Sequence, residues 1–186
     1  MGGAASRREA GWVAADGETQ PVTVVGCGNW LVRSDRVGPR VLAALANKGA
    51  PDVVTQDVGV SILGLLDLLR GQELLILVDA CVGLAAPGTI LVREPDPELP
   101  LPPTSSVHQI GPLETLAVAR ELYPEQLPRR TVLVLIETGG LETQAEAETC
   151  RRAVEVVEQQ IEDWRAASPS AQRPEGCEQS QTGRSW

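Results

Sequence analysis

Two kinds of apolar pattern alternate along the chain. Short continuous apolar runs, typical of buried strands, predict strands at 21–27, 53–58, 74–78, 89–93 and 131–136. Apolar residues spaced three or four positions apart predict helices at 36–48, 61–70, 111–122 and 143–164. Strands that alternate with helices indicate a parallel or mostly parallel sheet. We therefore predict an α/β fold in three layers, with a mostly parallel twisted sheet of about five strands and helices on both faces.

The two ends of the chain lack this pattern. Residues 1–20 combine Gly, Ala and charge without periodicity, and from about residue 167 the composition shifts to Ser, Gln, Gly and Pro. We expect a flexible leader at 1–20, a single α/β domain at 21–166 and a disordered tail at 167–186. A proline-rich loop at 95–107 is of a length that is usually functional or mobile inside a compact domain.

Composition narrows the classes of function. The chain has 186 residues and a net charge of -9, whereas proteins that bind nucleic acid need clustered Lys and Arg, so we expect no nucleic-acid partner. The four cysteines show no C-x-x-C spacing, which argues against a zinc or redox motif. No apolar run reaches the length of a signal peptide core or of a membrane span. We therefore expect a cytoplasmic protein with no membrane partner.

The stretch at 22–40 joins a buried strand to a helix through a glycine turn. Gly26 and Gly28 allow a sharp backbone turn and a close approach of other groups. The turn differs from the dinucleotide fingerprint G-x-G-x-x-G because Leu31 replaces the third glycine. Asp57, about thirty residues past the turn, matches the acid that binds ribose in such proteins only loosely. Nucleotide binding is therefore not the favoured interpretation.

Three side chains are candidates for chemistry. Asp35 follows the glycine turn, Asp79 follows the strand at 74–78, and His108, the only histidine, follows the long loop. If the strands at 21–27 and 74–78 are parallel neighbours, both aspartates lie at the carboxyl edge of the sheet, where open α/β folds bind ligands. Two carboxylates and an imidazole suit a divalent metal and also suit proton transfer.

Each candidate also has an ordinary structural interpretation. An aspartate at a strand end often caps a turn, and a single histidine on a loop is often solvated. Cys27 and Cys81 lie near the same edge, but no basic partner is placed beside them, so core packing is the better interpretation. The Glu-rich helix face at 146–162 is most simply a solvated surface.

Motifs in a fixed order connect these candidates. They are G-C-G-N at 26–29 followed by Asp35 and Gly38, a hydrophobic strand that ends in Asp79-Ala80, P-G-T at 87–89, and S-x-H-x-x-G at 106–111. With this order and spacing, residues 21 to 164 resemble the maturation endopeptidases of [NiFe]-hydrogenases. Members of that family remove the C-terminal extension of the hydrogenase large subunit after nickel insertion.

The resemblance implies an aspartic-type endopeptidase with a phosphorylase/hydrolase-like fold. Its partner would be the large-subunit precursor, and it would have no cofactor of its own, because it contacts nickel that the substrate carries. Position by position, the family's metal-contacting residues fall on Asp35, Asp79 and His108. Asp35 and Asp79 are then also the catalytic carboxylates.

The chain departs from the family pattern at two places. The family has two acids and a glycine where this chain has Ser34-Asp35-Arg36, and an Asp-Gly-Gly-Thr turn, linked to substrate selection, where it has Asp57-Val58-Gly59-Val60. We assign Asp57 and Gly59 to substrate binding because they remain from that turn. We assign Arg36 to substrate binding as well, since it can bind a substrate carboxylate.

Two alternatives follow from the same features. A non-cleaving maturation factor of the same fold would recognise the nickel site without cutting. A peptidyl-tRNA hydrolase-like enzyme opens with a similar G-x-G-N strand, but its catalytic histidine follows soon after the turn. Residues 30–50 contain no histidine and the chain is acidic, so this alternative ranks lower.

Overall fold

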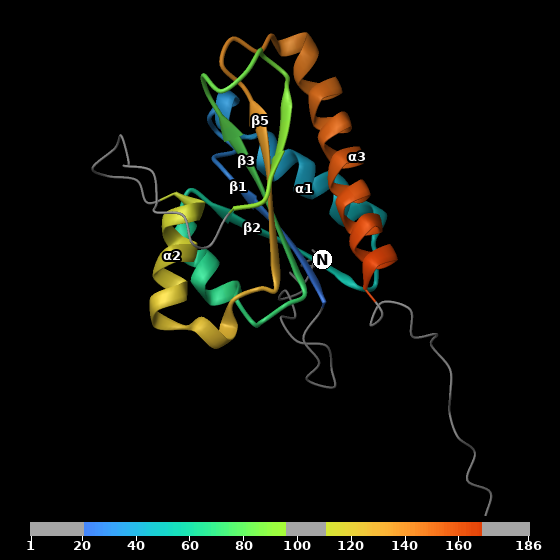
Figure 1. Ribbon diagram of the computed structural model, residues 1–186. Helices are drawn as coiled ribbons and strands as arrows, with labels where there is room; N and C mark the ends of the chain where they lie inside the picture. Colours follow the sequence, from blue (N-terminus) through green and yellow to red (C-terminus); the bar gives the residue numbers. More distant parts are fainter. Residues whose placement is uncertain (1–20, 96–110, 169–186) are drawn as a thin grey trace, which may run out of the picture.

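The computed structural model describes residues 21–95 and 111–168, which build a five-stranded sheet with helices on both faces (Figure 1). The strands, in the sheet order β2-β1-β3-β5-β4, are β2 (Val53–Gly59), β1 (Val22–Cys27), β3 (Leu74–Cys81), β5 (Arg130–Glu137) and β4 (Ile90–Arg93). The first four are parallel, and β4 pairs antiparallel with β5 at one edge. The predicted α/β fold with a mostly parallel sheet is confirmed.

In the described part of the chain, three α-helices and three short 3-10 helices accompany the strands. They are η1 (Arg33–Asp35), α1 (Val37–Lys48), η2 (Ile62–Leu68), α2 (Pro112–Leu122), η3 (Pro124–Gln126) and α3 (Thr143–Ala167). The α-helix expected at 61–70 is wrong in type, because η2 forms there instead. The segment is short and includes Gly64, so α-helical hydrogen bonding adds little to what packing on the sheet already provides.

Alternate side chains of the strands supply two separate cores. Val22, Val24 and Ile76 face α1 and α3, whereas Leu75 and Leu77 face η2 and α2. The helices lie accordingly, with α1 and α3 on one side of the sheet and α2 on the other (Figure 1). Because both faces are covered, the central run at 74–78 is fully buried. Burial of each such side chain stabilises the fold by roughly 1.5–3 kcal/mol.

The carboxyl ends of β1 and β3 lie level with each other. The parallel register pairs Gly26 with Val78, so Asp79 sits just beyond the last paired residue of β1. The sequence places the end of this strand at Asp79, but β3 continues to Cys81 because it pairs with β5 as far as Glu137. Asp79 is therefore held inside a strand rather than on a free loop.

Three of the predicted segments fall wholly or mostly outside residues 21–95 and 111–168. The leader at 1–20 lies outside the described residues, as do nearly all of the loop at 95–107 and of the tail at 167–186. Their assigned behaviour and the domain boundaries stay predictions. Among residues 21–95 and 111–168, no helix combines the length and hydrophobicity that a membrane crossing requires.

Candidate functional site

The first turn of α1 packs directly on the ends of β1 and β3, at Gly38. A Cβ atom at this position would lie 2.2 Å from the carbonyl oxygen of Cys27 and 2.7 Å from that of Val78. Real Cβ atoms do not approach backbone oxygens so closely, so glycine is required here. This contact fixes where α1 begins, and with it the segment that carries Asp35.

Substituting Gly38 by Ala should therefore destabilise the protein by about 2 kcal/mol, in the range of overpacked cores. Gly64→Ala is the matched control, because its nearest neighbour would be 4.0 Å from the new Cβ. Urea unfolding of the two variants measures the difference. Equal midpoints for Gly38→Ala and Gly64→Ala would contradict the close packing of α1 on the sheet.

Asp35 is turned back over the glycine turn. Gly28 has a φ of +129°, and a Cβ there would lie 1.9 Å from the Asp35 carbonyl oxygen. The backbone N–H of Asn29 donates a hydrogen bond to Asp35 Oδ2 at 2.9 Å. Gly28 thus permits the close approach that places the Asp35 carboxylate at the carboxyl edge.

Asp79 lies beside it, half-buried, and accepts a hydrogen bond from the Ala80 N–H at 2.8 Å. Burial, together with the negative charge of Asp35, raises the pKa of Asp79 to about 6. The two carboxylates are therefore close enough for their charges to interact, as expected from the strand order. A carboxyl group with a pKa in this range can exchange a proton near neutral pH.

Cys27 lies close to all three aspartates of the carboxyl edge, Asp35, Asp57 and Asp79. Burial raises the pKa of its thiol, and the charges of Asp79, Asp57 and Asp35 raise it further. The side chain is 5% exposed, within the core that faces α2. A thiol in this setting stays protonated and is no nucleophile. The core-packing interpretation of Cys27 is confirmed.

Asp57 and Gly59 connect the loop after β1 to the end of β2. Asp57 Oδ2 accepts a hydrogen bond from Trp30 Nε1–H at 2.9 Å, and Oδ1 accepts one from the Gly59 N–H at 2.8 Å. The Gly59 carbonyl oxygen accepts the Gly28 N–H at 2.9 Å. Asp57 is exposed at the same edge as the two other aspartates. Its role in substrate binding stays a prediction.

Arg36 is engaged inside the protein. Its guanidinium donates two hydrogen bonds to Glu146, from Nε to Oε1 at 2.8 Å and from an Nη atom to Oε2 at 2.9 Å. Arg40 donates to the same carboxylate at 2.6 Å, and Arg33 Nε lies 3.8 Å from it. A substrate carboxylate would have to compete with Glu146 for Arg36. The assignment of Arg36 to substrate binding stays a prediction.

The interpretation of the Glu-rich face at 146–162 as solvated is wrong at Glu146. This residue is 2% exposed, because the first turn of α3 points it at η1 and α1. Hydrogen bonds from Arg36, and then from Arg40, lower the pKa of Glu146 to about 2. Sequence reasoning missed this residue, since its partners lie more than a hundred residues away.

Glu137 is a second buried acid that sequence reasoning missed. It lies at the end of β5, 1% exposed, and accepts backbone N–H groups of Gly83, Leu84, Ala85 and Gly139. Burial acts to raise the pKa of Glu137, but these hydrogen bonds hold it below its usual range. Glu137 thereby fixes the loop that follows Asp79. The sequence does contain one signal for Glu137, since an acid ends the apolar run at 131–136 and two glycines follow closely.

The third predicted metal-contacting residue, His108, lies outside the described residues. Within 21–95 and 111–168, no three His, Cys, Asp or Glu side chains are grouped so that they could hold a metal ion. The structure thus brings together Asp35 and Asp79, with Asp57 at the same edge. The full triad with His108 stays a prediction.

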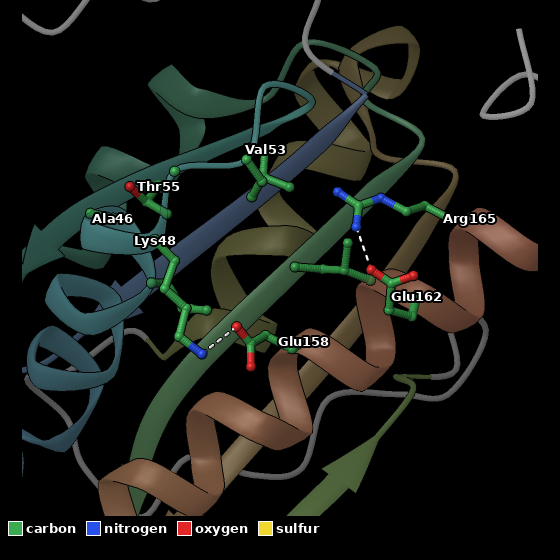
Figure 2. A pocket seen from close by; sticks show the side chains of 11 residues that line it. Ala46, Lys48, Val53, Thr55, Glu158, Glu162 and Arg165 are labelled. Carbon is green, nitrogen blue, oxygen red and sulfur yellow. Dashed lines mark hydrogen bonds and ion pairs between the residues drawn. The ribbon is translucent and has the colours of Figure 1, made fainter. Parts of the chain in front are cut away.

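Two of the hollows formed by the described residues lie near the sheet. The larger, about 450 Å³, lies between the end of α1, the start of β2 and α3 (Figure 2), at the opposite end of the strands from Asp35 and Asp79. Its charges pair with one another, as Lys48 with Glu158 at 2.6 Å and Arg165 with Glu162 at 2.5 Å. A smaller hollow of about 330 Å³ borders η1 at the carboxyl edge.

A family model described as HycI, hydrogenase maturation protease, matches residues 39–164, more than half of the chain. The chain belongs to the hydrogenase maturation protease family. The match includes Asp57, Asp79 and His108, and it begins four residues after Asp35. A comparison with curated protein sequences finds no significant match.

Solved structures of this family have the same fold. A hydrogenase maturating endopeptidase HybD from E. coli is 24% identical with a TM-score of 0.64, over 76% of this chain and 92% of that one. An endopeptidase from Escherichia coli is 26% identical with a TM-score of 0.63, over 79% and 93%. A [NiFe] hydrogenase maturation protease HybD from Thermococcus kodakarensis is 20% identical with a TM-score of 0.57, over 75% and 97%.

Proposed function

We propose that the protein is an aspartic-type endopeptidase that removes the C-terminal extension of a [NiFe]-hydrogenase large-subunit precursor after nickel insertion. The observation that carries the proposal is the pairing of Asp35 with Asp79 at the carboxyl edge, with the pKa of Asp79 raised to about 6. Membership of the hydrogenase maturation protease family supplies the class of substrate.

The two carboxylates have separate roles in this proposal. Asp35, oriented by the Asn29 N–H, contacts the nickel that the precursor already holds, and His108 completes the contact. Asp79, which the resemblance also places at the metal, serves as the base. The contact fixes the scissile bond beside Asp79 and polarises it. Asp79 then takes a proton from the attacking water, because its raised pKa suits a general base near neutral pH.

Exposed apolar side chains around the site suit a protein substrate. Of the exposed large apolar residues in the described part of the chain, most follow the carboxyl ends of β1, β2 and β3: Trp30, Leu31, Val32, Val60, Leu63, Val82 and Leu84. Apolar surface gathered at one edge is typical of protein docking. In the proposal, this apolar rim receives the surface of the precursor around its nickel site.

A cytoplasmic setting belongs to the same proposal. Cys27, Cys81 and Cys150 are free thiols, two of them buried. Free thiols are the rule in reducing compartments. The loss of the second acid at Ser34 keeps one alternative, a factor of the same fold that binds the nickel site without cutting it.

The test compares nickel-loaded with nickel-free precursor. We expect the protein to shorten the nickel-loaded precursor and to leave the nickel-free form intact, because the metal places the scissile bond at the two aspartates. Mass spectrometry of the product gives the cleavage site. Equal trimming of both forms would contradict nickel recognition, and tight binding without any product would favour the non-cleaving factor.

A further inference from the structure

Three arginines at the carboxyl edge surround a single buried acid. Arg33, Arg36 and Arg40 extend from η1 and α1 toward Glu146. Their side chains are 49%, 33% and 36% exposed, whereas that of Glu146 is 3% exposed. The negative charge is therefore hidden, and the positive charges reach solvent. Three guanidinium groups against one carboxylate leave an excess of two positive charges in a chain whose net charge is -9.

Among the described residues, Glu146 is the only acid that forms an ion pair with these arginines. Asp35, the other acid of the segment, has its carboxylate held by the Asn29 N–H over the glycine turn. Glu142, at the start of α3, is exposed and is not among the residues that line the adjoining hollow.

The hollow beside these arginines has the groups that an anion needs. It measures about 330 Å³ and is lined by Arg33, Ser34, Thr138, Gly140, Leu141 and Glu146. Arg33 donates one hydrogen bond, from an Nη atom to the Leu141 carbonyl oxygen at 2.8 Å. Within the described part of the chain, its other N–H groups have no hydrogen-bond partner, so they are available to a ligand.

We propose that this hollow is a subsite for a carboxylate of the substrate peptide, with Arg33 as the residue that binds it. Guanidinium groups bind carboxylates through paired hydrogen bonds, as Arg36 and Glu146 already do in this structure. Ser34 lines the hollow and immediately precedes Asp35, so the hollow adjoins the segment that carries Asp35. In the proposal, the bound peptide extends from the two aspartates into this hollow. The subsite rests on the proposed function only for the identity of the chain that carries the carboxylate.

The test uses three short peptides made of Gly and Ser. The first carries one central Glu and an amidated C-terminus, the second carries Gln in its place, and the third carries Gln with a free C-terminus. Binding to the whole protein is followed by NMR at low salt, on the Nε–H signal of Arg33. We expect at least one acid-bearing peptide to bind about tenfold more tightly than the neutral one. Tighter binding of the first peptide would show that the subsite takes a side-chain carboxylate, and tighter binding of the third would show that it takes a terminal carboxylate.

Variants of Arg33 test whether the preference for acid comes from this subsite or from the overall positive charge of arginine side chains. Arg33→Gln should remove the preference for acid, as followed on backbone amide signals, and Arg33→Lys should keep part of it. Arg129→Gln is the matched control, since Arg129 is 76% exposed and lies at the opposite end of β5. Among residues 21–95 and 111–168, its only ion-pair partner is Glu73. Equal binding of all three peptides, or an equal loss in Arg129→Gln, would overturn the subsite.

The outcome is independent of cleavage. If the preference for acid is present while no precursor is cut, the subsite stands and the proposed protease activity fails. If precursor is cut while the peptides bind equally, the activity stands and the subsite fails.

Discussion

Replacing Asp79 by Asn is expected to lower the rate of precursor cleavage by about 10²- to 10⁴-fold, the usual effect of losing a general base. Asn has nearly the same shape, and its side-chain oxygen can still accept the Ala80 N–H. The packing at the end of β3 should therefore survive while proton transfer is lost. Cleavage assays on nickel-loaded precursor measure the rate.

The same substitution should stabilise the fold at alkaline pH. The pKa of Asp79 is about 6 in the folded protein, above the ordinary value of 3.8 for an aspartate, so the folded form binds the proton more tightly than the unfolded chain does. Ionisation therefore costs stability as the pH rises from about 4 to about 6, and the full cost, up to about 3 kcal/mol, applies above that range. Asp79→Asn removes this cost.

Urea unfolding at two pH values tests whether Asp79→Asn raises the free energy of unfolding only where Asp79 is ionised. Asp79→Asn should be about 1–3 kcal/mol more stable than the wild type at pH 8, and equal to it at pH 4. Asp67→Asn is the control, because Asp67 is exposed on η2. A gain in stability that is the same at both pH values would mean that charge burial at Asp79 is not its source. Cleavage by the wild type should also fall as the pH drops below about 6.

Glu146→Ala is expected to destabilise the protein by about 3 kcal/mol. The substitution removes the carboxylate that balances the partly buried guanidinium groups of Arg36 and Arg40. Glu146 joins the first turn of α3 to η1 and α1. Its loss should also loosen the segment that positions Asp35. Cleavage should therefore weaken even under conditions where the variant is folded.

Urea unfolding of Glu146→Ala should be compared with that of Glu155→Ala. Both residues lie on α3 and lose the same atoms, but Glu155 is exposed. The folded-state pKa of Glu146, about 2, lies below the ordinary 4.5, so its contribution is present above pH 4.5 and is lost as the pH falls toward 2. The gap between wild type and Glu146→Ala should narrow over that range. Equal losses in the two variants would show that Glu146 is an ordinary surface acid.

The apolar patterns and the glycine turn were enough to predict the strands of the sheet and to place two candidate site residues near strand ends. The run at 74–78 is buried on both faces, which only a central strand with helices on both sides allows. The glycine turn at 26–28 places Asp35 near the end of β1, and the parallel register brings Asp79 level with it. The strand and the turn depend on residues close together in the sequence, whereas the register pairs distant residues such as Val22 and Leu74.

The polar interior could not be predicted from the same patterns. Glu146 looks like part of a solvated stripe until α3 is docked on α1, since Arg36 is 110 residues away. Glu137 looks like an ordinary strand end until the loops at 83–85 and 139 close over it. The short η2 and the antiparallel β4 likewise depend on packing against the sheet rather than on local preference.

By itself, the sequence determined the α/β architecture and placed Asp35 and Asp79 near the ends of their strands, because periodicity and glycine turns act locally. The pairing of β1 with β3, which brings the two aspartates to one edge, is visible only in the tertiary structure. Only the tertiary structure decided the electrostatics of that edge. Burial beside Asp35 raises the pKa of Asp79, and Glu146 neutralises only one of three surrounding arginines. Both effects arise between groups distant in the chain, whose charges interact strongly only after folding removes water from between them.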